Sequence, residues 1–154
     1  MPIKFATCSY LEFRPEMGLP VRTTAGEARF IRYRVAGWLD ALTPSRWFIN
    51  KPDAEFTHFM IQKIEEAGVD RIVAQAQAIA DHHGQPDATI VLLCFENLKT
   101  KAGGDWCHRS LVARYLAEKL GYEIPELGTV APMPAAAGGS IEPSEPEPEQ
   151  LSLL

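Results

Sequence analysis

The stretch TIVLLCF at residues 89–95 decides the fold class of this chain. It carries no charge and, apart from Thr89, no polar side chain, which predicts a β-strand. A strand that is apolar throughout, instead of alternating with polar residues, is typical of a central parallel strand covered on both faces. The stretch therefore predicts the centre of a layered α/β domain.

Three helices are expected around this strand, each from apolar residues that recur at helical spacing. DAEFTHFMIQKIEEAG at residues 53–68 has Asp53 as its N-cap, and VDRIVAQAQAIADHHG at residues 69–84 follows it. CHRSLVARYLAEKLGY at residues 107–122 comes after the strand. All three patterns stop at a glycine, which is favoured just past a helix end.

The rest of the chain's first half is less regular. IKFATCSY at residues 3–10 predicts a short first strand, whereas two prolines and a glycine predict a loop over residues 11–24. Residues 29–42 are consistent with a strand followed by a short helix, and SRWFIN at residues 45–50 predicts a further strand. Together these elements predict an α/β domain over residues 1–128, Rossmann-like and layered, with a mostly parallel sheet.

Composition places the chain among ordinary globular proteins. It has 46% hydrophobic and 23% charged residues, and no run of the roughly 18 uncharged apolar residues that a membrane span needs. The opening MPIKFATCSY lacks the long apolar run of a secretory signal, so we expect a cytoplasmic protein with no membrane partner. Its three cysteines are then expected as reduced thiols.

The C-terminal residues differ in character from the rest. Residues 129–149 are rich in Pro, Ala, Gly, Ser and Glu, which predicts a disordered acidic tether. Residues 131–154 carry −4 of the total charge of −5, which leaves −1 for residues 1–130. A body so close to neutral lacks the general basic footprint of a protein that grips DNA by its phosphates.

Thiols and polar side chains gather where the predicted strands end and the last helix begins. Sites in parallel sheets form at this carboxyl edge. The first strand ends in Cys8 and Ser9, the central strand in Cys94 and Glu96, and the last helix opens with Cys107, His108 and Arg109. We therefore expect all three cysteines at one edge of the sheet.

The start of the last helix has the features of a catalytic thiol site. Unpaired backbone N–H groups and the helix dipole stabilise a thiolate there, and the neighbouring cations add to this effect. We predict Cys107 as the nucleophile and His108 with Glu96 as the acid/base pair. Arg109 is predicted to clamp a phosphate or carboxylate of the substrate.

The other two thiols have two interpretations. Cys94 is a further catalytic candidate, and Cys8 and Ser9 are predicted to bind substrate beside it. The alternative is that Cys94 and Cys8 are small core residues, which is the usual place of an unpaired cysteine. A zinc site made of the three cysteines and His108 is another alternative, but no close C-x-x-C pair supports it, so neither a metal nor a cofactor is predicted.

VLLCFE at residues 91–96 followed by CHRSLVARYLAEKL at residues 107–120 resembles the signature of an uncharacterised family. This is the family called domain of unknown function four-eight-eight, the YeaO-like proteins. Some members also begin with a strand ending Thr-Ser-Tyr, to which ATCSY is similar with one cysteine inserted. The resemblance implies a Rossmann-like fold and a shared site at Cys94, Glu96, Cys107, His108 and Arg109, but no established reaction.

QLSLL at the end of the chain resembles the pentapeptide with which bacterial replication and repair proteins dock on the DNA polymerase sliding clamp. The match makes Gln150 the polar anchor, Leu151 and Ser152 the next two positions, and Leu153 and Leu154 the hydrophobic pair, with leucine where phenylalanine is commoner. A Pro-rich acidic tether would hold the peptide away from the body. The alternatives are a chance match, leucines that fold back on the domain, or a degradation signal.

These patterns together predict a DNA-metabolism protein of bacterial or phage type. It would be recruited to the sliding clamp and act through its thiol site on a nucleotide, a nucleobase or DNA. The alternative is a non-catalytic regulator or competitor that binds the clamp and has structural cysteines. A run of arginines fits either a phosphate-binding wall or a solvated face: Arg22, Arg29, Arg32 and Arg34.

Overall fold

The structure, a computed structural model, describes residues 3–95 and 108–128. The strands are β1 (Lys4–Ser9), β2 (Leu19–Arg22), β3 (Gly37–Trp38) and β4 (Thr89–Cys94). The helices are α1 (Asp53–Ala67), α2 (Val69–His82) and α3 (His108–Leu120), with short 3-10 turns η1 (Pro15–Met17) and η2 (Asp40–Leu42). Within the described part of the chain, no helix is both long and apolar enough to span a membrane.

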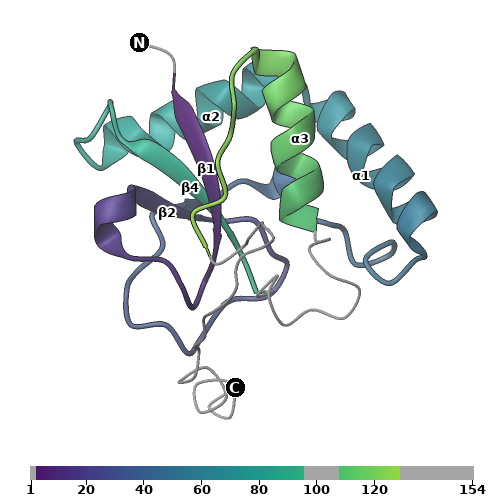
Figure 1. Ribbon diagram of the computed structural model, residues 1–154, viewed down its shortest axis with the longest axis horizontal. Coiled ribbons are helices and arrows are strands. Elements are labelled where there is room, and N and C mark those ends of the chain that lie inside the picture. The colour runs from purple at the N-terminus through teal and green to yellow at the C-terminus, as the bar shows by residue number, and fades with distance from the viewer. Residues whose placement is uncertain (1–2, 96–107, 129–154) are drawn as a thin grey trace, which may run out of the picture.

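The four strands form one parallel sheet in the order β1-β4-β2-β3 (Figure 1). β4 is central, with Cys8 opposite Leu93 on one side and Val21 opposite Leu92 on the other. Five of its six residues are buried, as expected for a strand covered on both faces. The predicted α/β fold with a mostly parallel sheet is confirmed.

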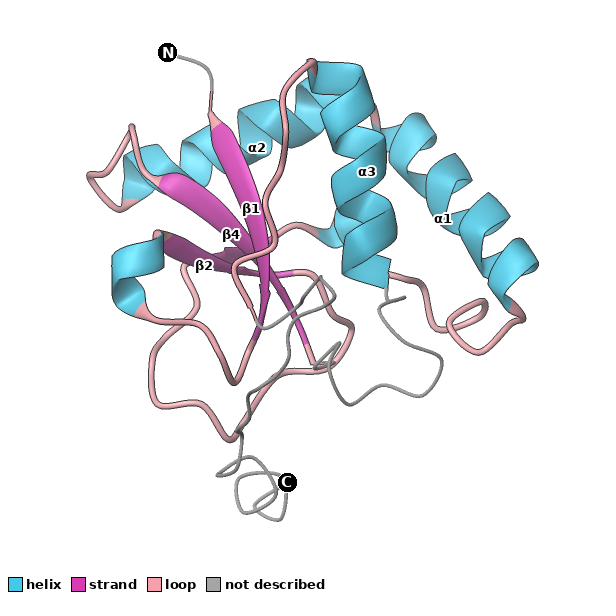
Figure 2. Ribbon diagram, in the orientation of Figure 1, coloured by secondary structure: helices cyan, strands magenta, loops and turns pink. Residues whose placement is uncertain are grey.

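All three helices pack on one face of the sheet and form the main core with it (Figure 2). α1 contributes Phe56, Met60 and Ile64, and the other two helices contribute similar stripes. These stripes meet the side chains of Ile90 and Leu92 from β4, which point to the same face because they are two residues apart. The face that the sequence periodicity predicts for each helix is therefore the face that it buries.

The opposite face of the sheet is covered by irregular chain instead of helices. Cys8, Val91 and Leu93 point to this side and are fully buried there. Two loop segments, residues 10–17 and 28–35, supply the side chains that cover them. β4 is therefore covered by helices on one face and, on the other, by these two loop segments, residues 10–17 and 28–35, which we call the strap.

β2 lies inside residues 11–24, where the sequence predicted a loop, so that prediction was wrong for residues 19–22. Pro20 is tolerated because its missing N–H faces β3, and its carbonyl accepts a hydrogen bond from Ala36 there. Gly18 precedes the strand with φ +143°, and a Cβ at this position would collide with the carbonyl oxygen of Thr89. Gly18 and Pro20 therefore lie at the start of β2 and do not prevent the strand from forming.

The predicted strand at residues 45–50 does not form, and the chain turns there instead. Phe48 is buried, whereas its neighbours Trp47 and Ile49 are 63% and 41% exposed. One buried anchor flanked by exposed apolar residues satisfies the core without a strand partner. Of the segment at residues 29–42, only β3 and η2 are regular.

Candidate functional site

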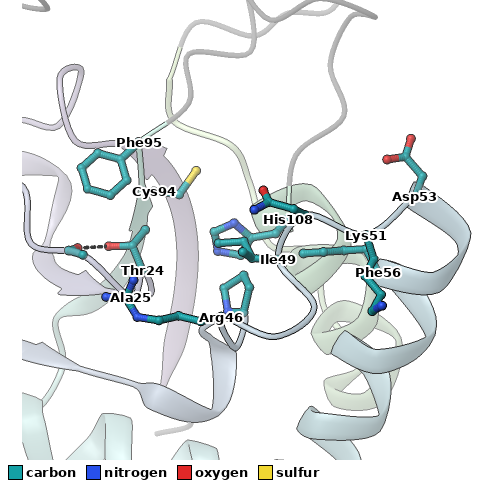
Figure 3. Close-up of a pocket in the computed structure, with 13 residues that line it drawn as sticks. Thr24, Ala25, Arg46, Ile49, Lys51, Asp53, Phe56, Cys94, Phe95 and His108 are labelled. Atoms are coloured by element: carbon teal, nitrogen blue, oxygen red, sulfur yellow. Dashed lines mark hydrogen bonds between the residues drawn. The ribbon is translucent and has the colours of Figure 1, made fainter.

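A cavity of about 500 Å³ opens at the carboxyl edge of the sheet, where β2 and β4 end and where α1 and α3 begin (Figure 3). Its walls hold a thiol, an imidazole and two cations. The lining residues that bear on its chemistry are Thr24, Arg46, Lys51, Phe95, Cys94 and His108. Of the predicted site residues that the structure describes, Cys94 and His108 therefore lie in this recess.

The Cys94 thiol is held by a buried guanidinium. Nη1 of Arg109 donates a hydrogen bond to the Cys94 sulfur over 3.0 Å, and both side chains are 1% exposed. Arginine keeps its charge in any protein environment. A cation this close to sulfur favours the thiolate over the thiol.

Glu126 balances the charge of this arginine. Its two carboxylate oxygens accept from Nε and Nη2 of Arg109 over 2.8 and 2.9 Å, a bidentate geometry. Glu126 also accepts from the Thr7 hydroxyl over 2.7 Å and from the Gly128 amide over 3.1 Å. Thr7 and Gly128 thus hold the carboxylate, the carboxylate fixes one edge of the guanidinium, and Nη1 is directed at Cys94.

His108 is held in one orientation by Thr23, at the end of β2. Its Nε2 lies 3.1 Å from the Thr23 carbonyl oxygen and 3.4 Å from the Thr23 hydroxyl. The carbonyl only accepts, and the hydroxyl already donates its proton to the Leu93 carbonyl. Nε2 of the neutral ring therefore carries the proton, which makes Nδ1 the basic nitrogen.

The cavity favours an anionic ligand. Arg46 and Lys51 are exposed side chains on its rim, against a single carboxylate, Asp53, among the lining residues. Asp53 and His108 are the first residues of α1 and α3, so the positive ends of two helix dipoles also meet at this place. Two cations and two helix starts around one recess are the electrostatic setting for a phosphate or carboxylate group.

The structure separates Cys8 and Ser9 from the cavity. Cys8 points to the strap-covered face and is fully buried, and Ser9 is fully buried with its hydroxyl donating to Glu12 over 2.8 Å. Burial, together with the carboxylates of Glu12 and Glu126, raises the pKa of the Cys8 thiol to about 12. Cys8 is therefore a protonated core thiol, and its predicted contact with substrate has no support in the geometry.

Three groups of predicted site residues lie outside the described residues: Glu96, Cys107, and Gln150 to Leu154. Their predicted roles stay predictions. Among residues 3–95 and 108–128, no group of three or more His, Cys, Asp or Glu side chains is placed to hold a metal ion.

The sequence did not predict Thr23 and Glu126, which orient His108 and Arg109. Glu126 follows α3 in a segment without a motif, and Thr23 lies in a stretch that was expected to be a loop. The predicted role of Arg109 also changes, because its guanidinium faces Glu126 and Cys94 inside the protein rather than the substrate. A sequence signal for such partners was lacking, since both depend on how distant segments cross.

No family model, no curated protein and no solved structure matches this chain.

Proposed function

We propose that this chain is a thiol-dependent enzyme of bacterial DNA metabolism, acting on a nucleotide, a nucleobase or DNA. The observation that carries the catalytic part is the hydrogen bond from Arg109 to the sulfur of Cys94 at the wall of the cavity. Glu126 pairs with this guanidinium and offsets the cost of burying it, and a further N–H of Arg109 is directed at the Cys94 sulfur. A thiolate stabilised by that N–H has the nucleophilic character that covalent catalysis requires.

The chemistry is nucleophilic group transfer. The Cys94 thiolate attacks an electrophilic carbon or phosphorus of the substrate, and the bond to the leaving group breaks with its electron pair. His108, protonated at Nδ1, gives that proton to the leaving group. Water, deprotonated by the same nitrogen, then releases the product and restores the thiolate. Arg46 and Lys51 would hold the anionic part of the substrate.

The proposal changes the nucleophile from Cys107 to Cys94. Cys94 is the thiol for which the described residues supply an activating partner, whereas Cys107 lies outside them. Cys107 and Glu96 stay candidates for a second thiol and an acid/base group. The proposed resemblance to the YeaO-like family would include all of these residues in one site.

The recruiting part of the proposal is docking on the bacterial sliding clamp through QLSLL at residues 150–154. Three leucines close together in an acidic, Pro-rich sequence can act as apolar anchors for a partner's pocket. A chain whose first 130 residues are nearly neutral would then reach DNA by its partner instead of by a general basic surface.

The catalytic proposal is tested by iodoacetamide labelling of the full chain over a range of pH, read by peptide mass spectrometry. We expect Cys94 to be labelled with a midpoint below the value of about 8.5 typical of a free thiol. Cys8, which is equally buried and whose pKa is raised by that burial to about 12, is the internal control and should resist labelling until strongly alkaline pH. The Arg109→Lys variant should shift the Cys94 midpoint upward.

Labelling of Cys94 only at the alkaline pH at which Cys8 reacts would contradict the catalytic proposal. The chain would then be a non-catalytic clamp-binding regulator with structural thiols. Because Cys8 and Cys94 are measured in the same digest, this comparison needs no variant and is not affected by any loss of folding in Arg109→Lys.

A further inference from the structure

The structure exposes three arginines on the strap that covers the sheet face opposite the helices. Arg29, Arg32 and Arg34 are exposed, whereas Phe30, Ile31 and Tyr33 between them are partly buried against the sheet. Residues 22–34 hold four arginines and one glutamate, so this segment has a net charge of +3 within a body of −1.

The strap is fixed in place by its apolar side. Tyr33 donates a hydrogen bond to the Tyr10 carbonyl over 2.6 Å, and its ring lies 4.9 Å from that of Phe13. Phe30 contacts Phe95 with ring centroids 6.2 Å apart. The arginines are therefore presented from a held backbone, which lowers the entropy cost of binding through them.

The three exposed guanidiniums have no acidic partner in the described part of the chain. None of the ion pairs among the described residues involves Arg29, Arg32 or Arg34, whereas Arg22 lies 4.0 Å from Glu27 and stacks on Trp38. All three are arginine rather than lysine, and the guanidinium fork matches phosphate oxygens in pairs. Three such groups along one short segment match a chain of phosphates better than a single ion.

The strap leads to the thiol cavity. Phe95 contacts Phe30 on the strap and is itself 38% exposed at the cavity wall, and Thr24 to Gly26 line the cavity just before the arginines begin. A hollow of about 430 Å³ beside Arg29 is lined by the partly exposed Tyr33, with the buried Tyr10 behind it and Glu27 as its acidic member. Aromatic side chains beside cations are the elements with which proteins bind single strands.

We propose that residues 28–35 form a binding surface for single-stranded DNA that leads one nucleotide into the thiol cavity. This rests on the proposed function, and it names the substrate as a single strand. A duplex is disfavoured because Cys94, 1% exposed in a recess, cannot be reached by a group that stays stacked and paired. A free nucleotide would leave the three arginines of the strap without a use.

The test is fluorescence anisotropy of the full chain with a labelled thymidine oligonucleotide of about 12 nucleotides, within usual single-strand site sizes. The variant is Arg29→Gln, Arg32→Gln and Arg34→Gln together. Arg71→Gln, Arg114→Gln and Lys119→Gln together are the control, because they remove the same charge from exposed positions of α2 and α3, on the other side of the sheet. Three phosphate contacts predict a slope of log K against log salt near −2, or about a tenfold loss of affinity for a threefold rise in salt.

We expect the strap variant to lose most of that slope, and the control to keep it. A duplex of the same length should bind more weakly than the single strand. Equal losses in the two triple variants, equal binding of duplex, or no binding by the natural chain would each overturn the proposal. Labelling of Cys94 in the strap variant separates the two proposals, because it should be unchanged whether or not the strap binds DNA.

Discussion

Arg109 shows how one buried residue can join distant parts of a site. Its guanidinium, 1% exposed, has Glu126 on one edge and Cys94 on the other. The carboxylate compensates the charge of the guanidinium, so Arg109 can also donate a hydrogen bond to sulfur without leaving an unpaired cation in the interior. An arginine that the sequence offered as a substrate clamp is therefore better understood as a positioning residue for the thiol.

Cys8 and Cys94 show that neighbouring places on one sheet edge can have opposite chemistry. Their strands are adjacent and parallel, with Cys94 level with Ser9. One step along the strand turns Cys8 to the other face, where apolar side chains from the strap surround it. The sequence could predict that Cys8 and Cys94 lie at this edge, but not that they point to opposite faces of the sheet.

The raised pKa of Cys8 predicts an alkaline loss of stability. An unfolded thiol releases its proton near 9.0, whereas the folded one keeps it to about 12. Between these values the unfolded state binds fewer protons, so the free energy of unfolding should fall by up to about 1.4 kcal/mol per pH unit from this group, and its contribution is complete below pH 9. Urea unfolding of the full chain with reductant present, at pH 8 to 10.5, measures this slope.

Cys8→Ala is the matched variant for this prediction. Its overall stability should be lower because the side chain is fully buried, so the slopes are compared and not the absolute values. Between pH 9 and 10 the variant should fall less steeply than the natural chain. Parallel curves would mean that Cys8 titrates in the folded protein as it does in the unfolded one. Tyr10, whose pKa is raised by burial to about 12, adds its own loss only above pH 10.

The site residues divide by whether their partners are local. Cys94, His108 and Arg109 could be predicted because strand ends and helix starts are readable from periodicity. Glu126 could not, because it reaches Arg109 from an irregular segment after the helix. Thr23 holds His108 across 85 positions, and that proximity exists only once β2 is placed beside β4.

At the scale of elements, strong periodicity was decisive and short strands were not. β4 and the three helices follow their sequence patterns closely, although the N-cap of α1 is Pro52 and not the predicted Asp53, which is the first residue of the helix. β2 has four residues including Pro20, and β3 has two, so neither carries enough sequence to outweigh its breakers. Both are strands because β4 offers a partner edge, which is a tertiary cause.

The segment that follows α3 is a second element that only the structure reveals. The Thr7 amide donates to the Pro125 carbonyl over 2.9 Å, and the Leu127 amide donates to the Thr7 carbonyl over 2.7 Å. Glu126, between them, forms the side-chain link to Thr7 and Arg109. This short stretch therefore fastens α3 to the outer side of β1.

Replacing the carboxylate should loosen that fastening. Glu126→Gln removes the charge that compensates a buried arginine, and breaking such a pair typically costs about 3 kcal/mol in the free energy of unfolding. Urea unfolding at neutral pH measures the loss. Glu123→Gln, at an exposed position of the same segment, is the control and should stay within about 0.5 kcal/mol of the natural chain. Equal stabilities for the two variants would show that the buried pair is not a structural link.

At the scale of the whole molecule, positive and negative charges are concentrated in different segments. Within the total of −5, residues 22–34 carry +3 and residues 131–154 carry −4. A net charge near zero for the body excludes a general DNA grip, but it does not exclude a local one. The strap would act at short range on a single strand, whereas the terminal peptide would bring the chain to the place where single strands occur.

The proposed clamp peptide can be tested by variants that raise the affinity for the clamp as well as by variants that lower it. We expect a bacterial sliding clamp to bind the full chain, and a chain that lacks residues 150–154 to lose at least tenfold in affinity, since about 1.4 kcal/mol from its leucine anchors corresponds to that factor. Leu154→Phe should instead tighten binding by about threefold, because a larger apolar side chain buries more surface in the same pocket. Calorimetry measures all three, with Ser144→Phe as the control for an added aromatic residue. A docking peptide at residues 150–154 predicts that the deletion weakens binding, that Leu154→Phe strengthens it and that Ser144→Phe leaves it unchanged. Any other pattern contradicts it.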